Sequence, residues 1–347
     1  MLASLSSKAI MAKAKAMYGK RLTKEQYKEM MYKKTVAEVA DYLRSETAYA
    51  DDLSTIVPST IHRGQLENML QKVYFDHYNR LINFTPLEDS GYYSYLIRQV
   101  EINQIMKMIR LLNSNRAEDY ITQYPEFMDR YASFNLMHLA KVRSFDDLLA
   151  VLKSSHYEAL LMKFRPVGDA PIDYTACEMS LMGNYYLTVE LAIDKSFTGK
   201  TKKDLHEIFD TIIELKNITS IYRLKKYFPN ASYEYIKSHL LPRWNRLPQR
   251  TLDELIRTKD SAEFIKKLTA SPYARFLGAK DYVFIEYSAS CIRYNMCKRY
   301  LRFSTEAAVA FTAYMVLSEM EFANIACIIE GIRYQISPTE IEKLLVY

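Results

Sequence analysis

Residues 101–110 read EINQIMKMIR, and two later stretches share their pattern, ELKNITSIYR at 214–223 and EFANIACIIE at 321–330. Each stretch begins with a glutamate, has Asn or Gln three residues on and then Ile, and has Ile or Met three residues after that. The two apolar positions lie three residues apart, which places them on one face of a helix. A basic residue stands near the end of each stretch: Arg110, Arg223 and Arg333. The glutamates are 113 and 107 residues apart, so the pattern predicts an internal repeat of helical units.

A second pattern precedes the first one in every copy, by 34, 36 and 35 residues. It is a glutamate followed eight residues later by an aromatic residue, in the pairs Glu67 with Phe75, Glu178 with Tyr186, and Glu286 with Tyr294. Because the distance between the two patterns is nearly constant, we expect them on consecutive helices of one repeated unit.

A third pattern resembles the start of a helix. A residue that can cap free backbone amides is followed three residues later by an acid, at Thr35, Ser144 and Asp260. Eight residues after each cap comes a leucine, and soon afterwards a tyrosine: Leu43 and Tyr49, Leu152 and Tyr157, Leu268 and Tyr273. Each unit is therefore predicted to be a capped helix, a turn and two long helices.

The composition agrees with a helical fold. The 347 residues include only 8 Gly and 10 Pro, and 49% are apolar, which favours long helices around a sizeable core. We predict an all-α fold of three repeated helical domains, at residues 1–115 (with additional N-terminal helices), 116–230 and 231–347. Long helices are expected at Gln65–Ile82, Tyr93–Leu112, Asp204–Tyr227, Val283–Phe303 and Glu306–Tyr334.

The charge balance, the cysteines and the hydropathy argue against a zinc protein and against a membrane-spanning protein. The net charge of +6 is spread over 47 basic and 41 acidic residues, which indicates a solvated surface of mixed charge. The four cysteines form no Cys-x-x-Cys pair and have no histidine at zinc-ligand spacing, so we expect reduced thiols and no metal. The longest uncharged stretch near the C-terminus, Ala307–Ser318, has 12 residues, whereas a membrane-spanning helix needs about 20. We therefore predict no direct membrane span.

No motif of an enzyme is complete. Residues 197–201, FTGKT, resemble the end of a phosphate-binding loop, but Asp194 stands where that loop needs a glycine. The six histidines are scattered, and none lies in a Glu-x-x-His pair of the kind that binds iron in helical bundles. We therefore predict no catalytic residue, no cofactor and no enzymatic activity.

The repeated acids Glu101, Glu214 and Glu321 have two interpretations. In the structural one, they pair with Arg110, Arg223 and Arg333 or with a neighbouring copy of the unit. In the functional one, they line a central socket for a basic partner helix. These six residues are the candidate contacts to partner proteins.

Several stretches resemble the C subunit of bacterial and archaeal V-type ATPases, whose eukaryotic counterpart is the d subunit. They are the N-terminal residues 9–23, the segment Ser45–Tyr49, the sequence Ile61-His62-Arg63-Gly64 and the segment Asn217–Lys225. The resemblance extends over nearly the whole chain. The third copy departs from it, because Glu330-Gly331-Ile332-Arg333 replaces the Arg-x-Lys ending.

The resemblance implies three helical domains around a pseudo-threefold axis, forming a funnel. It implies a peripheral place on the cytoplasmic face of the membrane, bound to the proteolipid ring, with the tip of the central stalk (subunits D and F) held in the funnel. The role implied is passing torque between stalk and ring for H⁺ or Na⁺ transport. The sequence indicates neither which ion is moved nor whether the machine works as pump or synthase.

The alternative is a free-standing helical adaptor that binds an acidic partner or nucleic acid. Six basic residues near the N-terminus would form its binding patch: Lys8, Lys13, Lys15, Lys20, Arg21 and Lys24. The patch lacks the interleaved aromatic residues of known nucleic-acid-binding modules, so we expect no nucleic-acid partner.

Overall fold

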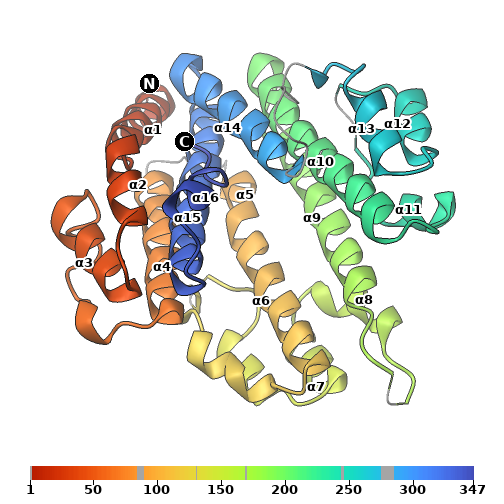
Figure 1. Cartoon of the computed structure of the whole chain (residues 1–347), viewed down its shortest axis with the longest axis horizontal. Coiled ribbons are helices and arrows are strands. Elements are labelled where there is room, and N and C mark those ends of the chain that lie inside the picture. The colour runs from red at the N-terminus through yellow and green to blue at the C-terminus, as the bar shows by residue number, and fades with distance from the viewer. Residues whose placement is uncertain (1, 84–89, 130, 169, 244–245, 275–284) are drawn as a thin grey trace. The chain divides into compact units, whose positions relative to one another are not determined.

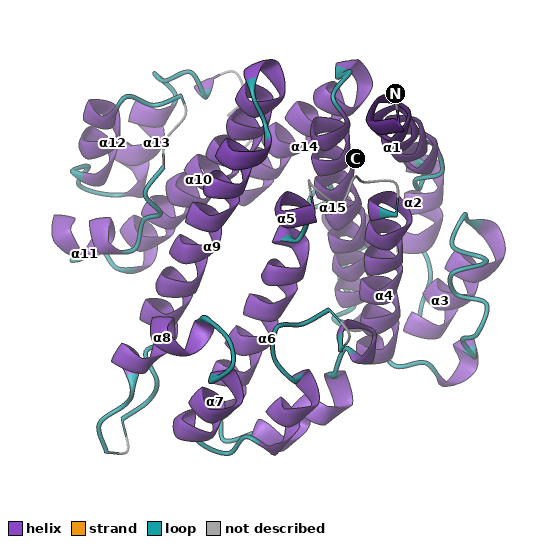
Figure 2. Cartoon of the chain, turned by 180° about the vertical axis from the view of Figure 1, so that it is seen from behind, coloured by secondary structure: helices purple, strands orange, loops and turns teal. Residues whose placement is uncertain are grey.

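The computed structural model describes the chain except for residues 1, 84–89, 130, 169, 244–245 and 275–284. Every regular element in the described part is an α-helix or a short 3₁₀ helix (Figure 1, Figure 2). The predicted all-α class is therefore confirmed. The elements group into two compact units, one made of Met1–Leu87 with Ala279–Tyr347 and the other of Glu88–Gly278. The division into three domains stays a prediction.

The first unit combines the two ends of the chain around α15. This long helix packs against α1, α4 and α14, and its residues 308–318 are all buried. A helix that is apolar on every side belongs at the centre of a core, and α15 is the centre of this unit. The elements are α1 (Leu2–Gly19), α2 (Lys24–Met31), α3 (Val36–Glu46), η1 (Pro58–Thr60), α4 (Arg63–Ile82), α14 (Ile285–Phe303), α15 (Ala307–Arg333) and α16 (Pro338–Glu342).

The second unit is built around three long helices, α6, α9 and α10. Helix α9 packs against both α6 and α10, and α10 packs against the short helix α13. The α-helices are α5 (Ser90–Tyr93), α6 (Tyr95–Asn113), α7 (Phe145–Leu152), α8 (Tyr157–Leu161), α9 (Tyr174–Ser196), α10 (Gly199–Tyr227), α11 (Tyr233–Ser238), α12 (Gln249–Ile256) and α13 (Ser261–Leu268). The 3₁₀ helices are η3 (Ala117–Gln123), η4 (Glu126–Met128), η5 (Leu136–Lys141) and η6 (Met162–Phe164).

The three predicted helix caps are confirmed. The side chains of Thr35, Ser144 and Asp260 accept hydrogen bonds from the backbone amides of the residues three positions on, at 3.1, 3.1 and 2.9 Å. They begin α3, α7 and α13, respectively. Two long helices follow each capped helix: α4 and α6, then α9 and α10, then α14 and α15.

The bounds of the predicted long helices agree with the observed ones to within two residues except at one start, and α9 was not among the predicted segments. Helix α10 begins at Gly199, five residues before the predicted Asp204. Residues 199–204 read GKTKKD and contain no apolar side chain, so hydrophobic spacing gave no signal there. The predicted residues 283–284 lie outside the described part. Across the described ranges, no helix is both long enough and apolar enough to cross a bilayer.

Candidate functional site

The three repeated glutamates lie on α6, α10 and α15; Glu101 and Glu214 are inside the protein, and Glu321 is half-buried. Glu101 is 2% exposed and Glu214 is fully buried. Each accepts a hydrogen bond from the hydroxyl of a tyrosine of the third sequence pattern: Glu101 from Tyr157, at 2.6 Å, Glu214 from Tyr273, and Glu321 from Tyr49. We call each of these contacts a Glu–Tyr clasp.

Backbone amides complete each clasp. The carboxylate of Glu101 accepts from the amide of Ser133, and that of Glu321 accepts from the amide of Leu22 at 3.0 Å. Glu214 accepts from the amides of Arg246 and Leu247, at 2.9 and 3.1 Å. Hydrogen bonds to an ionised acceptor are stronger than neutral ones. Each glutamate therefore joins its long helix to a tyrosine and to a loop elsewhere in the chain.

Local structure fixes the position of each tyrosine. A hydroxyl residue two positions earlier accepts from the tyrosine amide, at 3.2 Å for Thr47 with Tyr49, 3.3 Å for Ser155 with Tyr157 and 3.1 Å for Ser271 with Tyr273. The same hydroxyl donates to the carbonyl of a leucine in the last turn of the capped helix, which is Leu43, Leu152 or Leu268. The leucine and the tyrosine of the sequence pattern thus belong to one turn.

Burial keeps the tyrosines protonated and therefore able to donate. It raises the pKa of Tyr49, Tyr157 and Tyr273 well above the ordinary value, and the neighbouring carboxylate raises each further. Burial also raises the pKa of Glu321, while the hydrogen bonds from Tyr49 and Leu22 oppose that rise.

The Asn or Gln of the repeated stretch serves as a backbone clip in two of the copies. Asn217 donates to the carbonyl of Leu241 at 2.7 Å and accepts from its amide at 2.8 Å. Asn324 makes the same pair of hydrogen bonds to Val346, at 2.8 and 3.2 Å. Gln104, in the first copy, is buried, and its side-chain oxygen has no hydrogen-bond partner within the described residues.

The repeated arginines lie apart from this arrangement. Arg110 and Arg223 are exposed on α6 and α10. Arg333 pairs with Glu330, three residues before it, at 3.3 Å. The structural interpretation offered two kinds of partner for the acids, the repeated arginines or a neighbouring copy of the unit. The clasps agree with the second kind. The proposed contacts of all six residues to partner proteins remain predictions.

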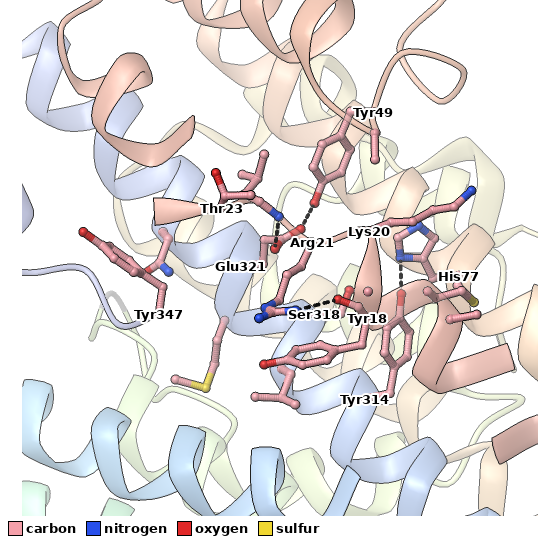
Figure 3. A pocket seen from close by; sticks show the side chains of 18 of the residues that line it. Tyr18, Lys20, Arg21, Thr23, Tyr49, His77, Tyr314, Ser318, Glu321 and Tyr347 are labelled. Atoms are coloured by element: carbon pink, nitrogen blue, oxygen red, sulfur yellow. Dashed lines mark hydrogen bonds between the residues drawn. The ribbon is translucent and has the colours of Figure 1, made fainter. Parts of the chain in front are cut away.

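The first unit contains a cavity of about 550 Å³ at the Glu321 clasp. Figure 3 shows Tyr49 and Glu321 on one side of it, and the hydrogen-bonded pair of His77 and Tyr314 on another, with Arg21 between. The hydroxyl of Tyr314 lies 2.9 Å from Nδ1 of His77.

Three acids and several cations line this cavity. Asp52 accepts a hydrogen bond from Arg80 at 2.8 Å and lies 3.9 Å from His77, and the nearby His77 and Arg80 lower the pKa of Asp52. Besides Arg80, the exposed cations are Lys13, Lys20, Arg21, Lys24 and Lys298. The sequence predicted four of these cations as a binding patch. It missed the cavity, because His77, Tyr314 and Lys298 come from distant helices and belong to none of the repeated patterns.

Asp194 and the cysteines, which the sequence analysis set aside as catalytic or metal-binding residues, lie in ion pairs or are buried or half-buried. Asp194 pairs with Lys202 at 3.1 Å and with His206 at 2.7 Å. The four cysteines form no disulfide with one another, and burial raises the pKa of Cys177 and of Cys297 to about 12. Among the residues that the structure describes, no three His, Cys, Asp or Glu side chains are grouped to hold a metal ion.

Comparison with known proteins identifies the family. The family model of the ATP synthase (C/AC39) subunit matches residues 10–344. The C subunit of the A-type ATP synthase of Methanosphaera stadtmanae is 21% identical over 348 aligned positions, which cover 96% of this chain and 86% of that protein. The C subunit of the A-type ATP synthase of Methanothermobacter thermautotrophicus is 20% identical over 278 positions, covering 77% of this chain and 66% of that protein. Since the family model spans nearly the whole sequence, the chain belongs to the ATP synthase (C/AC39) subunit family.

Proposed function

We propose that the chain is the non-catalytic coupling subunit of a rotary ATPase of the A/V type. In this role it joins the central stalk, subunits D and F, to the proteolipid ring on the cytoplasmic face of the membrane, and it passes torque between them for H⁺ or Na⁺ transport. The observation that carries the proposal is the family match over residues 10–344.

The clasps support a stiff body of the kind that torque requires. Two of them tie α6 and α10 to turns 56 and 59 residues further along the chain. The third ties α15 to a turn 272 residues earlier. Buried hydrogen bonds that are all satisfied fix one arrangement of the packed helices. Coupling needs stiffness and a matched surface, and it needs no reactive group of its own.

We further propose that the three predicted repeats close around a pseudo-threefold axis to form a funnel. The order of the clasps supports this. The glutamate of the first repeat holds the tyrosine of the second, that of the second holds the tyrosine of the third, and that of the third holds the tyrosine of the first. This order of contacts is cyclic, as expected for units arranged in a closed ring.

Reconstitution tests the coupling role. Stalk, ring and catalytic head from the same organism are assembled in vesicles with and without this chain, and ATP hydrolysis and ion uptake are measured together. We expect hydrolysis in both samples and ion uptake only where the chain is present. We also expect the chain to co-purify with the stalk and the ring. Full ion uptake without the chain would overturn the proposal.

A further inference from the structure

The cavity at the Glu321 clasp has an excess of positive charge. Two of its three acids are already engaged, because Asp52 pairs with Arg80 and Glu321 holds Tyr49 and the amide of Leu22. This leaves Asp51. Apart from Arg80, the lining has five exposed cations, and no ion pair to an acid is found for them within the described residues: Lys13, Lys20, Arg21, Lys24 and Lys298. A concave surface that is rich in one sign of charge attracts the opposite sign.

Arg21 is held in a position suited to binding an acid. Its guanidinium lies 4.3 Å from the centre of the Tyr18 ring, and Nη1 donates to the carbonyl of Tyr18 at 3.2 Å (Figure 3). These contacts use one face and one donor of the group. The remaining N–H donors form the fork that binds a carboxylate through two hydrogen bonds.

The wall next to Arg21 offers contacts for the rest of a ligand. The hydroxyls of Tyr18 and Tyr294 lie 3.3 Å apart, and the ammonium of Lys298 lies 5.1 Å from the centre of the Tyr294 ring. The stacked rings of Tyr27 and Tyr347 also line the cavity. A cavity of about 550 Å³ is within the usual range of ligand pockets, and it admits a short segment of chain.

We infer that this cavity receives an acidic segment of a partner protein, whose carboxylates pair with Arg21, Lys20 and Lys24. The inference rests on the proposed function, under which the partner is the central stalk. The inferred partner segment has the opposite charge to the basic helix of the socket interpretation of the repeated glutamates. Glu101 and Glu214 are enclosed within the protein, whereas the cations of the cavity are exposed.

The test compares two variants of the full chain with equal net charge. The first carries Lys20→Gln, Arg21→Gln and Lys24→Gln. The control carries Lys153→Gln, Lys200→Gln and Lys259→Gln, which replace exposed lysines of the second unit. Binding to the isolated stalk of the same complex is measured by calorimetry at two salt concentrations, and binding to a hexaglutamate peptide is measured in parallel. Thermal melting confirms that both variants fold.

We expect the first variant to lose at least about tenfold in affinity for the stalk and most of its salt dependence, while the control binds like the wild type. The hexaglutamate peptide should bind the wild type, compete with the stalk and fail to bind the first variant. If the wild type binds the stalk and the first variant binds equally well, the inference is wrong and the proposed function stands. If the wild type does not bind the stalk at all, both fail. Pyrophosphate that binds the cavity without displacing the stalk would also overturn the inference, in favour of a small-molecule site.

Discussion

The hydroxyl of Tyr49 donates a hydrogen bond to the carboxylate of Glu321, which lies 272 residues further along the chain. The same carboxylate accepts from the amide of Leu22. One side chain of α15 therefore holds two loops of the N-terminal region. Glu101 and Glu214 make the same type of contact with tyrosines 56 and 59 residues further along the chain. The ends of the chain are joined into one unit by a contact that recurs twice within the other unit.

The first prediction concerns this contact. We expect Tyr49→Phe to destabilise the protein by about 1–3 kcal/mol, because it leaves a half-buried carboxylate without one of its donors. The free energy of unfolding is measured by urea denaturation. Tyr32→Phe is the matched control, since Tyr32 is 72% exposed, and it should leave stability unchanged. Equal stability of the two variants would show that the clasp contributes nothing measurable.

The second prediction separates the two interpretations of the repeated acids. Glu101, Glu214 and Glu321 are changed together to Gln, and thermal melting and affinity for the stalk are measured at two salt concentrations. In the wild type, both oxygens of each carboxylate can accept hydrogen bonds from backbone amides and the tyrosine hydroxyl. A Gln side chain has an NH2 group in place of one oxygen, and this group faces donors with a donor. We therefore expect the melting temperature to fall sharply. We expect the folded fraction to bind the stalk at least as tightly as the wild type does. Unchanged melting together with weaker, less salt-dependent binding would support the socket interpretation instead.

Sequence patterns predicted the helices because each pattern has a local physical cause. The caps at Thr35, Ser144 and Asp260 use backbone amides three residues away, and the long helices have apolar residues at helical spacing. The partner of Glu321 has no such signal, because Tyr49 is distant in sequence. The Tyr and the Glu were both visible as repeated positions, but a single sequence does not show that one contacts the other.

The cavity was harder to predict for the same reason. Its cations Lys20, Arg21 and Lys24 come from one short segment and were visible as a basic patch. The rest of the lining comes from other helices and follows no repeat. The sequence therefore indicated a charged surface, and only the packing of α1, α4, α14 and α15 shows where that surface is concave.

The third prediction concerns the close contact between α15 and α16. Gly331 lies against Ile341, and a Cβ atom at this position would be 2.5 Å from Cγ1 of that isoleucine. We expect Gly331→Ala to destabilise the protein by about 1–3 kcal/mol through overpacking, despite the better helix propensity of alanine. Unfolding in urea gives the measurement.

Its control is Gly183→Ala in α9, where a Cβ atom would meet no other atom within 4 Å. That change should leave stability equal or raise it by up to about 1 kcal/mol. Adding Ile341→Val to Gly331→Ala should recover part of the loss, because the smaller side chain makes room for the new methyl group. A Gly331→Ala variant as stable as the Gly183→Ala variant would contradict the close packing of α15 on α16.

The last prediction is a pH dependence that comes from Glu321. Burial raises its pKa above the ordinary value of 4.5, so the folded state binds the proton more tightly than the unfolded state does. Stability falls with rising pH wherever the folded state holds more protons. The contribution of Glu321 is therefore fully present below pH 4.5 and is lost as the pH rises from there through the raised pKa of the folded state.

A Glu321→Gln variant has no such titration. We expect the difference in unfolding free energy, wild type minus Glu321→Gln, to decrease over that window when urea denaturation is followed across a pH series. Parallel curves for the two proteins would show that the carboxyl keeps an ordinary pKa in the fold, and a difference that grows with pH would show that the Tyr49 and Leu22 hydrogen bonds outweigh burial.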